Sequence, residues 1–590
     1  MSSTLAPAYT EIEDKIMCGI FGCIVKENAK DTLIEGLENL EYRGYDSAGI
    51  AISDGKKVFI EKEIGEVKAL KERLKDFEVS GSVGIAHTRW ATHGKPSLIN
   101  AHPHQSADGS VTLVHNGIIE NYLELKTEFG VKTISESDSE VIAELLAKFK
   151  EKSNLFTLEK VCKVLSGTYA LAVIFSNEPE TIYLARKESP IMLGEKGSEK
   201  FIASDANALK TRAEYFYIVG NDEFAKINAH GVQFFKNGKK IKKEKQKFKE
   251  NISFKRKFKY LMQDEIAQTP KALLKTAKNI NLINSKIINE INNFNLIYLI
   301  GCGTAYHSCL MGKKYLENIV KMPIQVEVAS EFKHANNLLN ANTLCVFVSQ
   351  SGETADTLSC VEKARKHGAK TLAITNVPNS TITFKADETI LMSAGWERAV
   401  ASTKAYSCQV LIFYLIKKYL LKEKYVSEIK KLSNNIKLLI KNNYDKLVNK
   451  IINHKKIMFI GRNYDYITAL EASLKLKEIS YINSIACPSG ELKHGTLALV
   501  DASTLVLTIS TNENLHQKNI SSMKEIEARG GECLLVSSNN NANLKLPQIG
   551  SDLMPILAII PFQIMACEVC LKLGYNPDKP RNLSKSVTVE

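Results

Sequence analysis

Two kinds of apolar pattern divide this chain of 590 residues. Between residue 18 and about residue 235, short apolar runs such as 83–87 and 112–115 alternate with amphipathic segments, which predicts strands interleaved with helices. The run Ser137-Asp138-Ser139-Glu140 has the composition of a capping box that opens a helix over 141–150. Asp138 would then lie in the first helical turn, where the helix dipole favours a carboxylate.

The second half contains an internal repeat in its apolar strands. LIYLIG at 296–301 matches IMFIG at 457–461, and EFKH at 331–334 matches ELKH at 491–494. A third match places Ser349 and Ser510 after similar strands. The offsets, from 301 to 461, 331 to 491 and 349 to 510, are 160, 160 and 161 residues. Such regular spacing predicts two copies of one α/β unit, each a parallel sheet covered by helices, with basic amphipathic helices over 411–453 between them.

The two copies differ at one turn. In the first copy, a strand over 343–348 leads into SQSGET at 349–354 and then a helix from about Ala355. A glycine- and hydroxyl-rich turn before a helix N-terminus is typical of a phosphate cradle, although an ordinary strand–helix turn remains the alternative. The second copy has STNEN at 510–514, without glycine. We therefore expect one phosphate site per chain, in the first copy.

Length and charge narrow the class of protein. A chain of 590 residues is too long for one core, and 44% hydrophobic with 24% charged residues is ordinary for a globular protein. The net charge of +13 comes from lysines spread over helices and a run near 236–249. Because the sequence has no groove-reading motif, these lysines predict a solvated surface and not a nucleic-acid site. A basic surface would favour anionic ligands such as sugar phosphates. The chain contains no run of about 20 apolar residues, so its sequence predicts no membrane span.

The cysteines and the N-terminus bear on the compartment. Twelve Cys are present, and only Cys567 and Cys570 are closely paired, within the apolar run 561–573 that predicts a buried helix. This pattern indicates a reduced, cytoplasmic protein with most thiols in its core. Residues 1–16 have no apolar centre and carry Glu11, Glu13 and Asp14 against Lys15, so they do not form a secretory signal.

The stretch MCGIFG at 17–22, taken alone, is typical of a short buried strand. It is followed by YRGYDSAG at 42–49, HTRWATHG at 87–94 and HNG at 115–117. With these motifs the N-terminal half resembles the class II glutamine amidotransferases, which are N-terminal-nucleophile hydrolases. In that family the cysteine is the first residue of the mature chain and its α-amine is the base, whereas sixteen residues precede Met17 here.

Three explanations fit this departure. The protein begins at Met17 and loses that methionine, or residues 1–17 are a cleaved propeptide, or this copy lacks glutaminase activity. We favour the first, because Cys18 is small and directly follows a methionine.

The second half resembles a pair of SIS (sugar isomerase) domains, and residues 17–590 together are similar to the isomerising glutamine:fructose-6-phosphate aminotransferase family. The matching motifs are CGT (302–304), SQSGET (349–354), ASTKA (401–405), KLKE (475–478), GELKHG (490–495), PRNL (580–583) and KSVTVE (585–590). The resemblance implies an α/β fold, with an N-terminal-nucleophile hydrolase (αββα) domain followed by two doubly wound parallel-sheet SIS domains. We expect an extension outside the mature protein at 1–17, the amidotransferase domain at 18–235, a basic hairpin and linker at 236–259, SIS domains at 285–425 and 450–575, and a catalytic tail at 576–590.

For the glutaminase half, the resemblance implies attack by the Cys18 thiolate on the side-chain amide of glutamine, which needs a base and an oxyanion hole. The family pattern assigns the oxyanion hole to Asn116 and Gly117. It assigns binding of the substrate carboxylate to Arg89, with support from Thr92 and His93, and binding of the substrate ammonium group to Asp138. Trp90 matches the gate of an ammonia channel. The histidines 87, 102, 104 and 115 are interpreted as structural hydrogen-bonding groups, and no metal is expected.

For the isomerase half, the resemblance implies open-chain fructose 6-phosphate as substrate. Lys585 would form an imine with the ketone, Glu478 would move a proton between C1 and C2, His494 would open the sugar ring, and Lys475 would steady a hydroxyl oxygen. Without the family, 475–478 would be interpreted as a solvated helix face. The sugar phosphate is assigned to Cys302, Gly303, Thr304, Ser349, Gln350, Ser351, Thr354 and Val400. Ala305 departs from the serine that is usual at that position.

The resemblance thus implies conversion of glutamine and fructose 6-phosphate to glutamate and glucosamine 6-phosphate, the first step of amino-sugar synthesis. It also implies a homodimer without cofactor. Two alternatives remain: a sugar-phosphate-binding regulator built on the SIS pair, which would not need Glu478, His494 or Lys585, and an amidotransferase with a phosphoribosyl acceptor, which the repeat disfavours.

Overall fold

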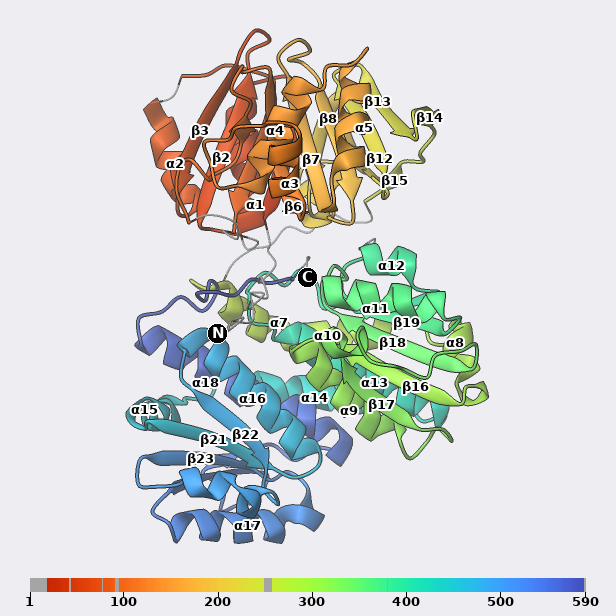
Figure 1. The fold of residues 1–590 in the computed structure, drawn as a ribbon. Coiled ribbons are helices and arrows are strands. Elements are labelled where there is room, and N and C mark those ends of the chain that lie inside the picture. Colours follow the sequence, from red (N-terminus) through yellow and green to blue (C-terminus); the bar gives the residue numbers. More distant parts are fainter. Residues whose placement is uncertain are drawn as a thin grey trace, which may run out of the picture. The chain divides into compact units, whose positions relative to one another are not determined.

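The computed structural model describes residues 18–41, 44–76, 78–90, 95–248, 257–378 and 380–587 (Figure 1). Contacts within the chain divide it into two compact units. The first comprises Met1–Phe254 with Ser586–Glu590, and the second comprises Lys255–Lys585.

The first unit is built on two antiparallel sheets. One has the order β15-β11-β9-β10-β1-β4-β2-β3 and the other β14-β13-β12-β8-β7-β6-β5. The strands of the first sheet are β1 (Gly19–Ile24), β2 (Ser47–Ser53), β3 (Val58–Ile64), β4 (Val83–Arg89), β9 (Met192–Lys196), β10 (Glu199–Ala203), β11 (Tyr215–Ile218) and β15 (Gln246–Lys247). Those of the second are β5 (His104–Gln105), β6 (Val111–Ile119), β7 (Gly167–Phe175), β8 (Ile182–Lys187), β12 (Glu223–Asn228), β13 (Gly231–Lys236) and β14 (Lys239–Ile241).

The alternation of side chains along these strands creates the layers. Ile20 of β1 packs in a buried cluster with Val114 of β6, between the sheets. Phe21, the next residue, points the other way and packs with Leu33 of α1. Leu113 of β6 likewise packs against α4 and α5. The expected αββα arrangement is therefore confirmed. The helices of this unit are α1 (Ala29–Leu40), α2 (Val67–Arg73), η2 (Leu74–Asp76), α3 (Tyr122–Glu128), α4 (Asp138–Lys148), α5 (Asn154–Val164) and α6 (Ala206–Lys210).

Helix α4 begins at Asp138, three residues earlier than the predicted start at 141. The Ser137 side chain accepts a hydrogen bond from the Ser139 backbone N–H, as an N-cap should. The reciprocal bond of a capping box is absent, because the Glu140 carboxylate accepts from the N–H groups of Ile134 and Ser135 instead. Glu140 thus fastens the preceding loop to the helix, and Asp138 is the first helical residue.

The second unit contains two five-stranded parallel sheets with the same strand order, β17-β16-β18-β19-β20 and β22-β21-β23-β24-β25. Their central registers also correspond, since Leu296 pairs with Thr343 and Lys456 with Thr504. The predicted pair of repeats is therefore confirmed. The strands are β16 (Leu296–Gly301), β17 (Ile324–Val328), β18 (Thr343–Ser349), β19 (Lys370–Thr375), β20 (Glu388–Leu391), β21 (Lys456–Gly461), β22 (Ser484–Pro488), β23 (Thr504–Ile509), β24 (Glu532–Ser537) and β25 (Leu544–Lys545).

Helices cover both sheets of the second unit, and α9 packs on α13 and α16 while α16 packs on α18 (Figure 1). They are α7 (Leu261–Asn279), α8 (Lys286–Asn289), η3 (Ile291–Asn293), α9 (Thr304–Leu316), α10 (Ala329–Phe332), α11 (Ala355–Lys366), α12 (Thr381–Lys385), α13 (Lys404–Leu420), α14 (Val426–Leu439), α15 (Asp445–Asn453), α16 (Tyr464–Ser480), η4 (Leu492–His494), η5 (Thr496–Leu499), α17 (Glu513–Glu527), η6 (Ser551–Leu553) and α18 (Met554–Lys572).

Two of these helices differ from the sequence-based prediction, since α13 is more buried and α18 is longer. All residues from Lys404 to Ile416 in α13 are buried, so this helix is central and not amphipathic. Helix α18 extends well before the apolar run at 561–573. Together with η6 it is, among the described residues, the one helix long and apolar enough to cross a membrane. However, 89% of its most apolar window is buried inside the structure, as in the core helix of an α/β domain.

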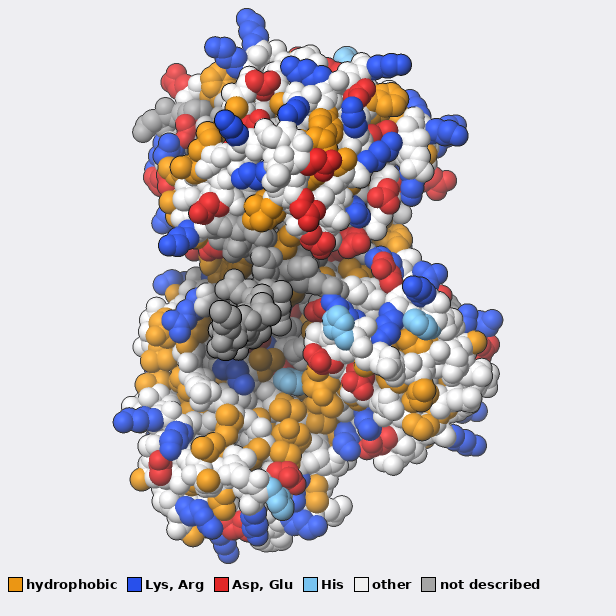
Figure 2. Space-filling model, viewed as in Figure 1, with side chains coloured by type: hydrophobic (Ala, Val, Ile, Leu, Met, Phe, Trp, Pro, Cys, Tyr) orange, Lys and Arg blue, Asp and Glu red, His pale blue; other side chains and the backbone are white. Residues whose placement is uncertain are grey.

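Charged side chains are mixed on the surface. Figure 2 shows Lys and Arg interspersed with Asp and Glu over the visible face of both units. The basic residues coloured on this face form no single patch.

Candidate active sites

The thiol of Cys18 lies directly before β1 and is buried. The backbone N–H of Trp90 donates to Cys18 Sγ at 3.4 Å, and the thiol donates to the Trp90 carbonyl oxygen at 3.6 Å. Burial raises the pKa of Cys18 to about 12, against the opposing effects of the Trp90 N–H and the Arg89 charge. The thiol is therefore protonated at neutral pH, and it needs a base before it can act as a nucleophile.

Asn116 joins the thiol-bearing residue to a histidine. Its Nδ2 donates to the Cys18 carbonyl oxygen at 2.8 Å, and its Oδ1 lies 3.0 Å from His87 Nε2. The same nitrogen lies 2.9 Å from the His115 carbonyl oxygen. Because both neighbours of this nitrogen are acceptors, His87 carries its proton on Nε2. That proton holds Asn116 Oδ1 and thereby directs Nδ2 toward Cys18.

Gly117 follows Asn116 on β6 and cannot be replaced without strain. Its φ is +133°, and a Cβ there would lie 2.0 Å from the Thr168 carbonyl oxygen. Only glycine fits this backbone, which is pressed against β7. The sequence-predicted pair of Asn116 and Gly117 therefore lies beside Cys18 on a rigid strand.

Arg89 and Asp138 bring opposite charges near the thiol. Arg89 ends β4 and is 3% exposed. Burial lowers its pKa, while Cys18, Asp138 and Asp46 act in the opposite direction. Asp138 accepts hydrogen bonds from the Ile119 N–H at 2.8 Å and from Ser139 Oγ at 3.2 Å. A fixed cation and a fixed anion on two walls of one site suit the two charged ends of an α-amino acid.

Trp90 packs against Cys18 and Ile118, and its ring meets Tyr45 edge to face at 5.4 Å between centroids. The predicted substrate residues Thr92 and His93 lie outside the described residues. His87 stacks on His102 at 4.1 Å, and His102 meets His104 at 4.6 Å between centroids. Burial lowers the pKa of His87 to about 3 and those of His102 and His104 well below the usual value. Within the part of the chain described, no group of three His, Cys, Asp or Glu could hold a metal ion.

The second unit buries a charged strip on α16. Glu471, Lys475 and Glu478 occur at helical spacing, so they share one face. Lys475 Nζ lies 2.6 Å from Glu478 Oε2 and 3.5 Å from Glu471 Oε1, and Lys475 and Glu471 are fully buried. It also donates to Thr304 Oγ1 at 3.0 Å, and Thr304 in turn donates to Glu471 at 3.1 Å. The strip thereby reaches the first residue of α9, in the other repeat.

The same strip sets the protonation of its members. Burial alone would lower the pKa of Lys475, but Glu478 and Glu471 outweigh it and raise that pKa. Burial raises the pKa of Glu478 despite the opposing charge of Lys475. A carboxyl group with a raised pKa accepts a proton more readily than an ordinary glutamate does, which suits acid–base catalysis.

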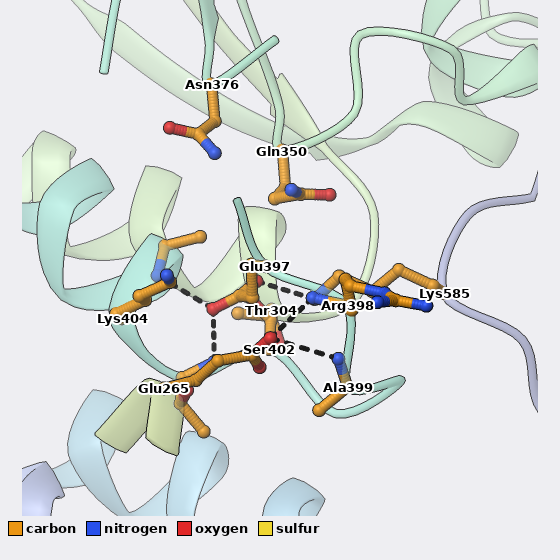
Figure 3. Close-up of polar contacts among 12 residues, drawn as sticks. Glu265, Thr304, Gln350, Asn376, Glu397, Arg398, Ala399, Ser402, Lys404 and Lys585 are labelled. Atoms are coloured by element: carbon orange, nitrogen blue, oxygen red, sulfur yellow. Dashed lines mark hydrogen bonds and ion pairs between the residues drawn. The ribbon is translucent and has the colours of Figure 1, made fainter. Parts of the chain in front are cut away.

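Lys585 reaches a second buried carboxylate. Its Nζ lies 2.5 Å from Glu397 Oε2, and the side chains are 3% and 0% exposed. Glu397 also accepts from Ser402 Oγ and from the N–H groups of Thr403 and Ala405, where α13 begins. Burial alone would raise the pKa of Glu397, but Lys585 and these donors hold it at about 2. In the view of Figure 3, Lys585 and Lys404 lie on opposite sides of Glu397.

A further carboxyl group belongs to this cluster. Glu265 Oε1 on α7 accepts from the backbone N–H groups of Arg398 and Ala399, while Oε2 is buried without a partner among the described residues. Burial and the neighbouring Glu397 raise the pKa of Glu265 to about 8. Lys404 donates to Gln268 and to the Trp396 carbonyl oxygen.

The predicted phosphate turn leads from β18 to α11. Ser349 Oγ lies 3.0 Å from Thr354 Oγ1 and accepts from the Gly352 N–H at 3.0 Å, while Ser351 Oγ accepts from the Glu353 N–H at 3.2 Å. Gly352 has φ +68°, and a Cβ there would meet Ser380 Oγ at 2.1 Å. The turn is thus a loop of hydroxyl groups at a helix N-terminus, where an anion is favoured.

The remaining predicted residues belong to other loops and helix ends of the second unit. Gly303 (φ +51°) precedes α9, and Cys302 before it has a pKa raised to about 11 by burial. The Val400 N–H donates to the Asp578 carbonyl oxygen at 3.5 Å. His494 ends η4 and is exposed, and no hydrogen bond or ion pair among the described residues joins it to the strip on α16.

Sequence reasoning missed Glu265, Glu397 and Glu471. The spacing Glu471-x3-Lys475-x2-Glu478 could have predicted an ion-paired helix face. No local pattern marks Glu397, because its partner lies 188 residues away in the chain.

Comparisons with known proteins agree with this division. A family model described as a glutamine amidotransferase domain matches residues 87–211, and one described as a SIS domain matches 290–417 and 450–547. Isomerizing glutamine–fructose-6-phosphate aminotransferases from Caldanaerobacter subterraneus subsp. tengcongensis and Clostridium tetani are 41% and 40% identical to this chain, covering 97% of it and 100% of each relative. The solved C-terminal domain of glucosamine-fructose-6-phosphate aminotransferase from Francisella tularensis is 32% identical with a TM-score of 0.51, covering 56% of this chain and 100% of that chain.

The fold and its two clusters define a class in which a glutamine amidotransferase domain is joined to a pair of SIS domains. Within that class, the chain belongs to the isomerizing glutamine–fructose-6-phosphate aminotransferase family.

Proposed function

We propose that this protein converts glutamine and fructose 6-phosphate to glutamate and glucosamine 6-phosphate. The observation that carries the proposal is the burial in one unit of Lys585 against Glu397 and of Lys475 against Glu478. A binding module for sugar phosphates would need neither a buried amine nor a carboxyl group with a raised pKa. We also propose that the enzyme works as a cytoplasmic homodimer.

In the glutaminase site, Cys18 Sγ attacks the side-chain carbonyl carbon of glutamine. Arg89 holds the α-carboxylate of the substrate and Asp138 its α-ammonium group, with Thr92 and His93 supporting the carboxylate. Asn116 Nδ2 and the Gly117 N–H stabilise the oxyanion. The proton of the thiol passes through the base to the leaving nitrogen, ammonia departs, and water hydrolyses the thioester to glutamate. The Trp90 ring closes the path of ammonia to bulk water. In bulk water ammonia would be protonated and would no longer be a nucleophile.

The base in this scheme is the α-amine of Cys18. An amide nitrogen has no basic lone pair, so the scheme requires a mature protein in which Cys18 is the first residue. Removal of Met17 from a chain that starts there would produce it.

In the isomerase site, the turn of Ser349, Gln350, Ser351 and Thr354 holds the phosphate, with Cys302, Gly303, Thr304 and Val400 around the sugar. His494 opens the ring, and the Lys585 amine forms an imine with the C2 ketone as water leaves. Ammonia then displaces Lys585 at C2. Glu478 takes the proton from C1 and returns it to C2, while Lys475 steadies a hydroxyl oxygen; the product is a 2-amino aldose phosphate.

The test is an assay of Lys585→Ala with both substrates. We expect the rate of glucosamine 6-phosphate formation to fall by more than about 10³-fold. Glutamine hydrolysis should be retained, because the two sites carry separate chemistry. The matched control is Lys441→Ala, which removes an exposed lysine of the second unit outside the proposed site. Normal product formation by folded Lys585→Ala would rule out the imine role.

A further inference from the structure

The second repeat carries a carboxylate at the position that corresponds to the proposed phosphate site of the first. The correspondence begins with the backbone. Gly303 precedes α9 with φ 51° and ψ −121°, and Asn463 precedes α16 with φ 57° and ψ −121°. Both residues follow the second strand in the order of their sheet, β16 or β21, so the two helices start in the same way.

The second residue of each helix points toward the end of that strand. A Cβ on Gly301 would meet Ala305, and a Cβ on Gly461 would meet Asp465. Positions 305 and 465 are therefore structural equivalents. The first repeat has a methyl group there, whereas the second has a carboxylate that is 1% exposed.

Asp465 is held by the turn that follows the neighbouring strand, β23. Its Oδ2 accepts from the Thr511 backbone N–H at 2.9 Å and its Oδ1 from Thr511 Oγ1 at 2.5 Å. Burial raises the pKa of Asp465 to about 6, against these bonds and the Asn512 N–H. Thr511 and Asn512 follow Ser510 as Gln350 and Ser351 follow Ser349 in the proposed phosphate turn.

The turn of the second repeat is also shorter. Strand β23 ends at Ile509 and α17 begins at Glu513, whereas β18 ends at Ser349 and α11 begins only at Ala355. The shorter turn has no counterpart of the Gly352 to Thr354 stretch that closes the loop of hydroxyl groups. The Asp465 carboxylate instead supplies acceptors for the N–H and hydroxyl donors that remain.

We propose that Asp465 is a built-in anion that occupies the phosphate cradle of the second repeat, so that each chain takes one sugar phosphate and not two. The ligand class that it excludes is the phosphate monoester, whose oxygens would accept from the same donors. The inference rests on the proposed function, which assigns phosphate to the first repeat. Asp465 is thus a specificity-determining residue that acts by filling a latent site.

The test removes the first cradle and then opens the second. In Ser349→Ala/Thr354→Ala, which keeps Asp465, we expect no saturable binding of inorganic phosphate or fructose 6-phosphate by titration calorimetry. Adding Asp465→Ala should restore saturable phosphate binding and a rise in Tm of a few degrees with phosphate concentration, since a ligand that binds only the folded state stabilises it. Adding Asp465→Asn, which keeps an acceptor for Thr511, should restore neither.

Each outcome bears on one step. A folded triple variant with Asp465→Ala that ignores phosphate overturns the inference. If the triple variant does not fold in buffer, we expect it to fold in phosphate. Asp465→Ser, which has a smaller polar side chain, gives a second measurement in the same background. If both variants stay unfolded with and without phosphate, the inference is also overturned. Unchanged phosphate binding by Ser349→Ala/Thr354→Ala would instead refute the assignment of phosphate to the first repeat, and with it the basis of the inference.

Discussion

Lys585 and Glu397 form a buried ion pair, with 2.5 Å between Nζ and Oε2. Glu397 is also the acceptor for three groups around the start of α13, so its charge is fixed before any sugar arrives. The ion pair holds Lys585 Nζ against Glu397, so the sugar must separate the two groups before the amine can reach the ketone.

Glu397→Gln tests this contact. Without the carboxylate, Lys585 loses its ionic partner and is positioned less firmly, so we expect kcat/KM for glucosamine 6-phosphate formation to fall about 10-fold with glutamine hydrolysis retained. The measurement is kcat/KM for fructose 6-phosphate at a fixed pH. Glu423→Gln, which removes an exposed partner of Lys418, is the control and should leave kcat/KM unchanged. An unchanged or raised kcat/KM in folded Glu397→Gln would contradict this positioning role.

His87 is expected to act on glutamine hydrolysis through Asn116. His87→Ala releases Asn116 Oδ1, so the amide can turn away from the oxyanion, and kcat for glutaminase should fall about 10²-fold with little change in KM. His87→Gln offers an N–H at a similar distance and should recover most of the loss. Isomerisation of fructose 6-phosphate serves as the internal control because it belongs to the other unit. Equal losses in the alanine and glutamine variants would show that the ring only packs.

Cys18→Ala should abolish glutamine hydrolysis and leave sugar-phosphate isomerisation intact, since the thiol is the nucleophile of one site only. A parallel loss of both activities in a folded variant would defeat the two-site assignment.

Intact-mass analysis of active protein made from its own gene should give a chain that starts at Cys18. The base proposed for the thiol exists only when the Cys18 nitrogen is a free amine. A glutaminase-active chain that still starts at Met1 or Ser2 would refute the N-terminal-nucleophile mechanism.

His494 is exposed on η4, and no hydrogen bond or ion pair among the described residues joins it to Glu478 in the strip on α16. If His494 completes the site of a second subunit, mixing inactive His494→Ala with inactive Glu478→Gln chains should restore part of the activity. Up to about a quarter of the sites in a random mixture would carry neither defect. A fully active monomer at low concentration would exclude this arrangement.

The sequence predicted what depends on local pattern and spacing. The offset of 160 residues predicted two matching sheets, and the strand–turn–helix pattern located the turn from Ser349 to Thr354. It could not predict that Asp465 fills the second turn, because that contact joins residues 46 apart on different elements. Glu397 was missed for the same reason. Helix α4 starts at Asp138 because Ser137 is its N-cap, so the predicted start at 141 was three residues late.

Helix α18 has a consequence for the order in which the protein is made. It packs against α16, α15, α14 and α7, so it closes the core of the second unit, yet it is the last helix in the described part of the chain. During translation, the apolar faces of those helices that contact α18 stay exposed until α18 has been synthesised. The strands of the first unit emerge more than three hundred residues earlier, up to Lys247 in β15. A nascent chain interrupted before Met554 would therefore expose a large apolar surface and be a strong client for chaperones.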